Sequence, residues 1–208
     1  MYDGASAPDL DKSVAGSSNG TVAGYGKSVY EKYDDGLGAV IRFRPVQFAD
    51  DFELLYGWHQ YAHVARYWNL SIPREAYREH LKAFLADKHQ ALYIGELDGV
   101  PMSYWECYWA VDDIIATGYE ALPDDQGVHL LIGPPEYIGR GLAGPLLAAM
   151  TEFLFRHEAT MKVVAEPDAG NEKMIHIFQK CGYRFQKHID LPDKRAALMF
   201  CDRERWRS

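Results

Sequence analysis

The chain has few cysteines, no long apolar run and no excess of positive charge. Its three cysteines, Cys107, Cys181 and Cys201, are too few and too scattered for a disulfide framework or a CxxC metal pair, so we expect no metal site. No apolar run approaches the length of a membrane span, and no basic segment followed by an apolar segment begins the chain. The odd number of cysteines fits a reducing compartment, and we expect a cytoplasmic protein.

The charge balance argues against two classes of partner. The chain carries 22 Lys and Arg against 30 Asp and Glu, a formal net charge of −8. A field of that sign disfavours nucleic acid and anionic membranes, and neither is expected as a partner. It still allows an anionic cofactor, because a local electropositive pocket is sufficient to bind one.

Composition and length favour one α/β domain preceded by an arm. At 208 residues, with 48% apolar and 25% charged residues, the chain is an ordinary globular protein of one domain. Residues 1–38 are rich in small, turn-forming residues, and we predict a flexible N-terminal arm there, before a domain at 39–208. The alternative is that this segment packs on the domain or on a second subunit through Tyr25, Val29, Tyr30 and Tyr33. A monomer or a homodimer is expected.

Apolar periodicity from residue 39 onward predicts mixed α/β structure. Strands are expected at 39–44, 91–97, 101–110, 128–132 and 162–166, with a last pair around Pro192-Asp193. Helices are expected at 50–60, at 74–87, from the turn at 139–143 to about 157, and from Asn171 to Cys181. Parallel pairing is expected only across the two strand–helix–strand crossovers.

The turn Gly139-Arg140-Gly141-Leu142-Ala143 follows an apolar strand and begins an apolar helix. Backbone N–H groups at a helix N-terminus bind phosphates well, and small residues let a pyrophosphate approach the main chain. Arg140 adds one possible charge-assisted contact. Gly-x-Gly alone is weak evidence, and the complete dinucleotide-binding and P-loop fingerprints are absent.

Two motifs together resemble the acetyltransferases of the GNAT superfamily. Ile138 to Ala143 resembles their acetyl-CoA pyrophosphate loop, Gln/Arg-x-x-Gly-x-Gly/Ala, with Ile138 at the usual Gln/Arg place. Asn171 to Tyr183 resembles their second hallmark, Asn-x-x-Ala-x-x-x-Tyr-x-x-x-Gly-Phe, with Phe178 at the usual Tyr. The resemblance implies a mixed, mostly antiparallel sheet flanked by helices, with a central parallel strand pair splayed around acyl-CoA. It also implies a set of cofactor-binding residues: Leu131, Ile138, Gly139, Arg140, Gly141, Leu142, Ala143, Asn171 and Phe178.

A narrower resemblance is to the aerobactin-type N6-hydroxylysine acetyltransferases of siderophore biosynthesis. It is carried by four strings, at 129–134, 164–168, 171–176 and 190–199. It implies direct acyl transfer in a ternary complex, from acyl-CoA (acetyl-CoA first) to an N-hydroxylated lysine or diamine, which yields a hydroxamate for iron acquisition. The expected partner is a small-molecule hydroxylamine acceptor.

The same resemblance assigns catalytic roles to His129 and Asp168, which match positions proposed as catalytic in that family. His129 alone would more often be a satisfied core histidine; with the resemblance it is the expected base, and Asp168 is expected to accept its second ring N–H. Because Phe178 cannot donate a proton, either His129 or water is expected to protonate the departing thiolate. Asn171 is expected to bind the pantetheine arm, with a simple N-cap as the alternative.

The acceptor pocket is expected to use an aromatic-rich set with one carboxylate: Trp58, His59, Trp68, Trp105 and Glu106. Core packing of the tryptophans and a solvated Glu106 is the alternative. Lys194 or Arg195, in a turn expected to face solvent, is a second possible contact for an acceptor carboxylate.

Two other functions remain open at this point. One is an aminoglycoside 6'-N-acetyltransferase-like resistance enzyme, which expects an acidic acceptor pocket. The other is a non-catalytic CoA-binding GNAT module, which Phe178 in place of Tyr favours.

Overall fold

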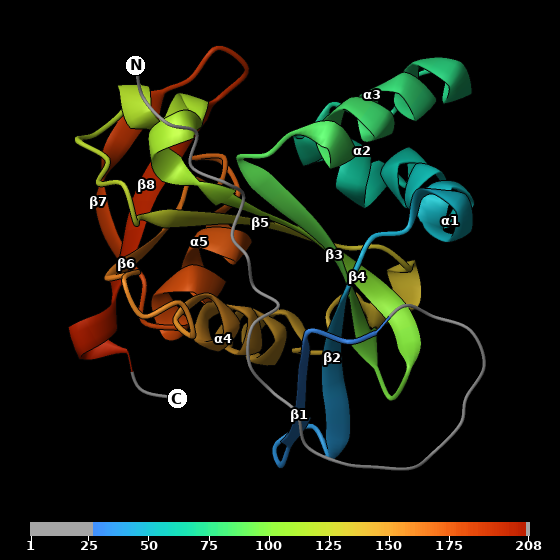
Figure 1. The fold of residues 1–208 in the computed structure, drawn as a ribbon, viewed down its shortest axis with the longest axis horizontal. Helices are drawn as coiled ribbons and strands as arrows, with labels where there is room; N and C mark the ends of the chain where they lie inside the picture. The colour runs from blue at the N-terminus through green and yellow to red at the C-terminus, as the bar shows by residue number, and fades with distance from the viewer. Residues whose placement is uncertain (1–26, 207–208) are drawn as a thin grey trace.

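The computed structural model describes residues 27–206, so most of the expected N-terminal arm lies outside the described residues. Within them, the chain forms an eight-stranded sheet in the order β1-β2-β3-β4-β5-β6-β8-β7 (Figure 1). The strands are β1 (Tyr30–Asp34), β2 (Ala39–Pro45), β3 (Gln90–Leu97), β4 (Val100–Trp109), β5 (Gln126–Ile132), β6 (Lys162–Ala165), β7 (Arg184–Asp190) and β8 (Arg195–Asp202). Every pairing is antiparallel except that of β5 with β6.

Helices cover both faces of the sheet. They are α1 (Phe48–Gln60), α2 (Ala62–Trp68), α3 (Arg74–Ala86), α4 (Ala143–Leu154) and α5 (Glu172–Lys180), with 3-10 helices η1 (Ala110–Asp112), η2 (Ile114–Thr117), η3 (Pro135–Tyr137) and η4 (Arg203–Arg205). Alternation along β4 places Trp105 in the core under α4 and Tyr104 in the core under α1 and α3. The α4–α5 layer and the α1–α3 layer therefore lie on opposite faces (Figure 1).

The parallel pair is short and then opens. β5 pairs with β6 only at Gln126↔Val163 and Gly127↔Val164, whereas β5 keeps its partner β4 as far as Ile132. On its other side β6 is held by β8. Beyond Gly127, β5 therefore has a strand partner on one side only. The expected splayed parallel pair is confirmed.

The structure departs from the sequence predictions in three places. The second crossover gives no parallel neighbour, because β8 lies between β6 and β7. Helix α2 was not predicted. The boundary expected at residue 38 falls inside the β1–β2 hairpin, since β1 pairs along its length with β2 and buries Tyr30.

A buried cation ties β2, β3 and α1 together. Arg44 donates to Asp51 through both terminal nitrogens at 2.8 Å, and through Nε to Glu96 at 2.8 Å. All three side chains are almost completely buried. Burial alone would lower the pKa of Arg44, but its hydrogen bonds to Asp51 and Glu96 outweigh that effect and raise it. Asp51 also accepts the backbone N–H of Gln47, so the cluster fixes the start of α1.

Replacing Arg44 by alanine is expected to lower the free energy of unfolding by about 3–5 kcal/mol, because two carboxylates then stay buried without a cation. Arg42→Ala is the matched control, since Arg42 lies on the same strand and pairs with Glu31 in solvent. That exposed pair should contribute less than about 1 kcal/mol. Urea denaturation of both variants measures the difference, and equal losses would contradict the assignment.

Candidate active site

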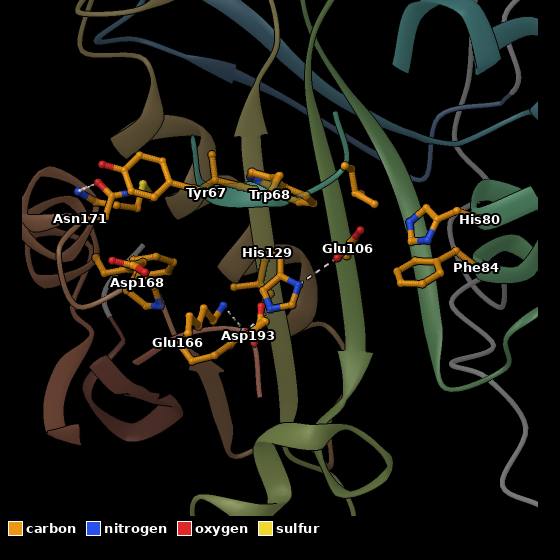
Figure 2. A pocket seen from close by; sticks show the side chains of 17 residues that line it. Tyr67, Trp68, His80, Phe84, Glu106, His129, Glu166, Asp168, Asn171 and Asp193 are labelled. Atoms are coloured by element: carbon orange, nitrogen blue, oxygen red, sulfur yellow. Dashed lines mark hydrogen bonds and ion pairs between the residues drawn. The ribbon is translucent and has the colours of Figure 1, made fainter. Parts of the chain in front are cut away.

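A cavity of about 280 Å³ opens where β5 and β6 separate (Figure 2). Its walls come from both helical layers, from β4 and β5, from the segment after β6, and from the β7–β8 hairpin. The lining residues are Tyr67, Trp68, Leu70, His80, Phe84, Glu106, Val128, His129, Leu130, Glu166, Pro167, Asp168, Asn171, Met174, Phe178, Asp193 and Lys194. The walls are mainly apolar, with polar groups gathered around His129.

His129 lies between two carboxylates (Figure 2). It faces Glu106 across the β4–β5 ladder, and its Nδ1 lies 2.9 Å from Glu106 Oε2. Its Nε2 contacts Glu166, which directly follows β6. The rings of Tyr108 and Trp68 pack beside it, with centroids at 4.9 and 6.2 Å. The ring is therefore fixed in orientation from both sides.

The two carboxylates are themselves held in place. Glu106 accepts a hydrogen bond from Tyr104 at 3.0 Å. Glu166 accepts one from Tyr108 at 2.7 Å, and Lys194 Nζ lies 3.4 Å from it. Gly127 makes the Tyr108 contact possible, because a Cβ there would lie 2.0 Å from the Tyr108 ring. A glycine at the point where β5 and β6 separate thus leaves room for the phenol that orients Glu166.

This arrangement determines the charge of His129. A carboxylate can only accept, so a histidine between two ionised carboxylates must donate from both nitrogens and carries a positive charge. Burial lowers the pKa of His129, but the charges and hydrogen bonds of Glu166 and Glu106 outweigh it and raise the pKa to about 10. Burial likewise raises the pKa of Glu166, but His129, Lys194 and Tyr108 together lower it to about 2. Neither ring nitrogen offers a free lone pair near neutral pH.

The expected pairing of His129 with Asp168 is wrong. Asp168 lines the cavity, but its Oδ1 accepts the backbone N–H of Gly170 at 2.7 Å, and Glu166 takes its expected place against His129. The available signal for Glu166 was an acidic residue at the end of the strand expected at 162–166, directly after three apolar residues. Sequence spacing could not choose between the two carboxylates, because that depends on where β6 ends.

The expected acceptor residues divide into two groups. Trp68 and Glu106 line the cavity. Trp58 and Trp105 belong to the core, Trp58 against Gly133 and Trp105 with its Nε1 donating to Ser103. For these two the core-packing alternative is what the structure shows. His59 is buried behind Trp68, with its Nδ1 2.8 Å from the carbonyl of Leu55.

A second cavity, of about 450 Å³, adjoins the first and runs toward the N-terminus of α4. Both cavities share Tyr67, Trp68, Leu130, Asn171 and Met174. Of the expected cofactor residues, six line the second cavity: Leu131, Ile138, Gly139, Leu142, Ala143 and Asn171. Phe178 lines the first, Arg140 is exposed near the Tyr137 ring, and Gly141 lies beside Leu142. Asn171 also caps α5, accepting the backbone N–H of Met174.

The turn before α4 has the backbone of an anion-binding loop. Gly139 and Gly141 have φ values of 77° and 76°, in the left-handed region that favours glycine. A Cβ at either would meet nothing within 4 Å, so their role is conformational, not steric. The first backbone N–H groups of α4 lack partners within the helix, as at any helix N-terminus, and are available to an anion.

Residues 47–191 match the protein family described as acetyltransferase (GNAT) domain. The chain belongs to the GNAT acetyltransferase family. It is 32% identical over 176 residues to the N(6)-hydroxylysine O-acetyltransferase of Escherichia coli, an alignment that spans 84% of this chain and 56% of that protein. It is also 32% identical to the N-hydroxyputrescine acetyltransferase of Acinetobacter baumannii, over 78% of each chain. The resemblance to hydroxylysine acetyltransferases seen in the sequence is thus confirmed.

Solved structures agree on the fold. An uncharacterized protein from Bacillus halodurans is 47% identical and superposes with a TM-score of 0.83, over 85% of this chain and 91% of that one. The aminoglycoside acetyltransferase AAC(6')-Ib in complex with coenzyme A is 26% identical, with a TM-score of 0.73 over 79% and 95%. The chain spans between 40% and 56% of the length of the first three curated relatives it matches.

Residues 27–206 contain neither a cluster of metal ligands nor a membrane-spanning helix. No group of three or more His, Cys, Asp or Glu side chains in this range is arranged to hold a metal ion. None of its helices has both the length and the apolar character needed to cross a membrane.

The imidazole of His129 is expected to titrate near pH 10, far above an ordinary histidine, because two carboxylates hold its proton. Glu166→Gln removes one of these charges and should lower that pKa. Carbon-labelled histidine resonances followed by NMR from pH 5 to 11 measure both values. An unchanged His129 titration in the Glu166 variant, or one near pH 6.5 in the unmodified protein, would contradict the charge assignment.

Proposed function

We propose that this chain is an acyl-CoA-dependent N-acyltransferase, with acetyl-CoA as the first donor to assay, that acylates an N-hydroxylated lysine or diamine. The product is a hydroxamate for siderophore biosynthesis and iron acquisition, made in the cytoplasm. The observation that carries the proposal is a charged His129 in a cavity with room for a small acceptor, which adjoins a second cavity beside a phosphate-binding turn. The hydroxylysine and hydroxyputrescine relatives support the acceptor class.

The larger cavity is the proposed binding site of the acyl-CoA. The turn at Gly139–Gly141 and the N-terminus of α4 would hold the pyrophosphate, with Arg140 free to approach it from solvent. Asn171, at the junction of both cavities, would contact the pantetheine arm. The backbone of β5 beyond Gly127, without a strand partner on that side, would contact the same arm.

The chemistry follows from the weak basicity of the nucleophile. A lysine ammonium has a pKa near 10.4 and must lose a proton before attack, whereas a hydroxylamine is far less basic and reaches the site neutral. As the C–N bond forms and the C–S bond breaks, the nitrogen loses a proton and the sulfur gains one. The doubly protonated His129 is suited to donate to the sulfur, and a neighbouring carboxylate is suited to accept from the nitrogen. His129 is thus proposed as the acid of the reaction, whereas the sequence led us to expect it as the base.

In this proposal His129 takes the place of the usual tyrosine acid. Phe178 lines the cavity but carries no hydroxyl, and the nearby Tyr183 hydroxyl is buried against Thr151 at 2.8 Å. Tyr67 lines both cavities and is the phenol to test against His129. Asp168, on the wall of the acceptor cavity, acts on the acceptor and not through the histidine.

An aminoglycoside acceptor is the second candidate, favoured by the likeness to AAC(6')-Ib and by the carboxylates on the cavity wall. A basic amine requires deprotonation, and a histidine without a free lone pair does not supply that step. Thiol release with kanamycin but not with hydroxylamines would favour this candidate. Coenzyme A binding with no transfer to either class would favour a non-catalytic module.

Gly141→Ala is expected to weaken CoA binding about tenfold, because a left-handed conformation costs an L-residue roughly 1–2 kcal/mol. Gly57→Ala is the matched control: it lies exposed in α1, away from both cavities, has an ordinary φ, and its added Cβ would meet nothing within 4 Å. That change should leave affinity unaltered. Isothermal titration with CoA measures both, and equal affinities would contradict the role of the turn.

His129→Gln is expected to lower kcat about 10²- to 10⁴-fold with hydroxylamine acceptors, while CoA affinity is retained. In the unmodified enzyme kcat should fall as the pH rises toward 10, because the proton on His129 is then lost. The alkaline decline should disappear in the variant. A thiol-release assay from pH 6 to 10 measures both, with Tyr67→Phe as the comparison. A normal kcat for His129→Gln and a collapsed kcat for Tyr67→Phe would transfer the acid role to Tyr67.

A further inference from the structure

The wall of the acceptor cavity has an excess of negative charge. Four carboxylates line it, those of Glu106, Glu166, Asp168 and Asp193. Lys194 is the one lining side chain, among the described residues, that is an ordinary permanent cation. His80 also lines the cavity, but burial lowers its pKa, more than the nearby Glu106 raises it, so the ring adds no positive charge near neutral pH.

The positive charges present are already engaged. His129 is shared between Glu106 and Glu166. The ammonium of Lys194 lies 3.4 Å from the same Glu166. A carboxylate on the acceptor would have to share the Lys194 ammonium with Glu166, which is buried and already lies beside it.

Two carboxylates on the wall have no cation beside them. Asp168, in the turn before α5, accepts only a backbone N–H, and no Lys, Arg or His in residues 27–206 lies within 4.0 Å of it. Asp193, at the tip of the β7–β8 hairpin, likewise has no ion pair within the described part of the chain. Both belong to the same cavity as His129, so an ammonium there can be matched without disturbing the site.

The space between these charges suits a hydrocarbon chain. Trp68, Leu70, Phe84 and Met174 give the cavity apolar and aromatic walls. Such walls stabilise a methylene chain by burial, and a ring face tolerates a nearby ammonium. The cavity therefore provides an acid group at its centre, apolar sides, and acidic side chains at Asp168 and Asp193 (Figure 2).

We infer that the acceptor is an N-hydroxylated diamine with a free ammonium and no carboxylate, and that Asp168 and Asp193 bind this ammonium. The inference rests on the proposed function and narrows it, because an N-hydroxylated amino acid also carries a carboxylate for which the wall has no free cation. Asp193 and Asp168 thereby determine specificity, and neither is required for the transfer itself.

The test compares three acceptors with the full-length protein and acetyl-CoA: N-hydroxycadaverine, N6-hydroxylysine, and N-pentylhydroxylamine, which lacks an ammonium. The expected order of kcat/KM places N-hydroxycadaverine at least about tenfold above the others, as one charge-assisted contact would give. Turnover of hydroxylysine at an equal or higher kcat/KM would overturn the inference and leave the proposed function intact. Absence of turnover with all three would overturn the proposed function, and the inference with it.

Variants separate recognition from catalysis. Asp193→Asn and Asp168→Asn should each raise KM for N-hydroxycadaverine about tenfold at nearly constant kcat, and leave N-pentylhydroxylamine unaffected. Asn at position 168 keeps an oxygen for the Gly170 N–H. Asp190→Asn is the matched control, an exposed carboxylate on β7 that does not line the cavity. A loss of kcat with every acceptor in the Asp168 variant would assign it to catalysis and contradict the inference for that residue.

Discussion

The separation of β5 from β6 after Gly127 is the constraint on which the rest of the molecule depends. β4 on one side and β8 on the other hold the two strands, so neither can move to close the gap. The residues after β6 stay hydrogen-bonded to β8, since Ala197 donates its backbone N–H to the carbonyl of Pro167, and Glu166 meets His129 across the opening toward β5. Both cavities, the capped start of α5 and the turn before α4 lie around this one interruption in the ladder.

Two clusters in this fold place one cation between two carboxylates, with different results. Arg44, Asp51 and Glu96 are sealed in the core and connect elements. His129, Glu106 and Glu166 are open to a cavity, and 29% of the histidine side chain remains exposed. A guanidinium does not lose its proton in a protein, whereas an imidazolium can transfer one. The same arrangement of charges therefore stabilises the fold where the cation is Arg, and can take part in proton transfer where the cation is His.

Much of the fold could be predicted from the sequence, because it depends on local patterns such as residue alternation in strands and glycine-containing turns. The alternation of β4 placed Glu106 and Trp105 on opposite faces, and Asp98-Gly99 marked its hairpin, where both residues have positive φ. The turn at Gly139–Gly141 identified the start of α4. β1 was missed because its burial comes from a partner strand, and Trp58 was misplaced because aromatic composition is the same in a core and a pocket. Predicting that Glu166 pairs with His129 would have required the exact end of β6, which the sequence does not define.

The half-paired edge of β5 has a consequence for how a ligand is recognised. From Val128 to Ile132 the main chain on that side has no neighbouring strand, and among the described residues His63 reaches the carbonyl of Ile132 at 3.0 Å. Peptide groups are identical whatever side chains they carry, so an extended molecule with amide groups of its own could complete the sheet there as a surrogate strand. Recognition of this kind does not depend on side-chain identity. The side chains of β5 can therefore change, and with them the chemistry of the site, while the main-chain hydrogen-bonding groups stay the same.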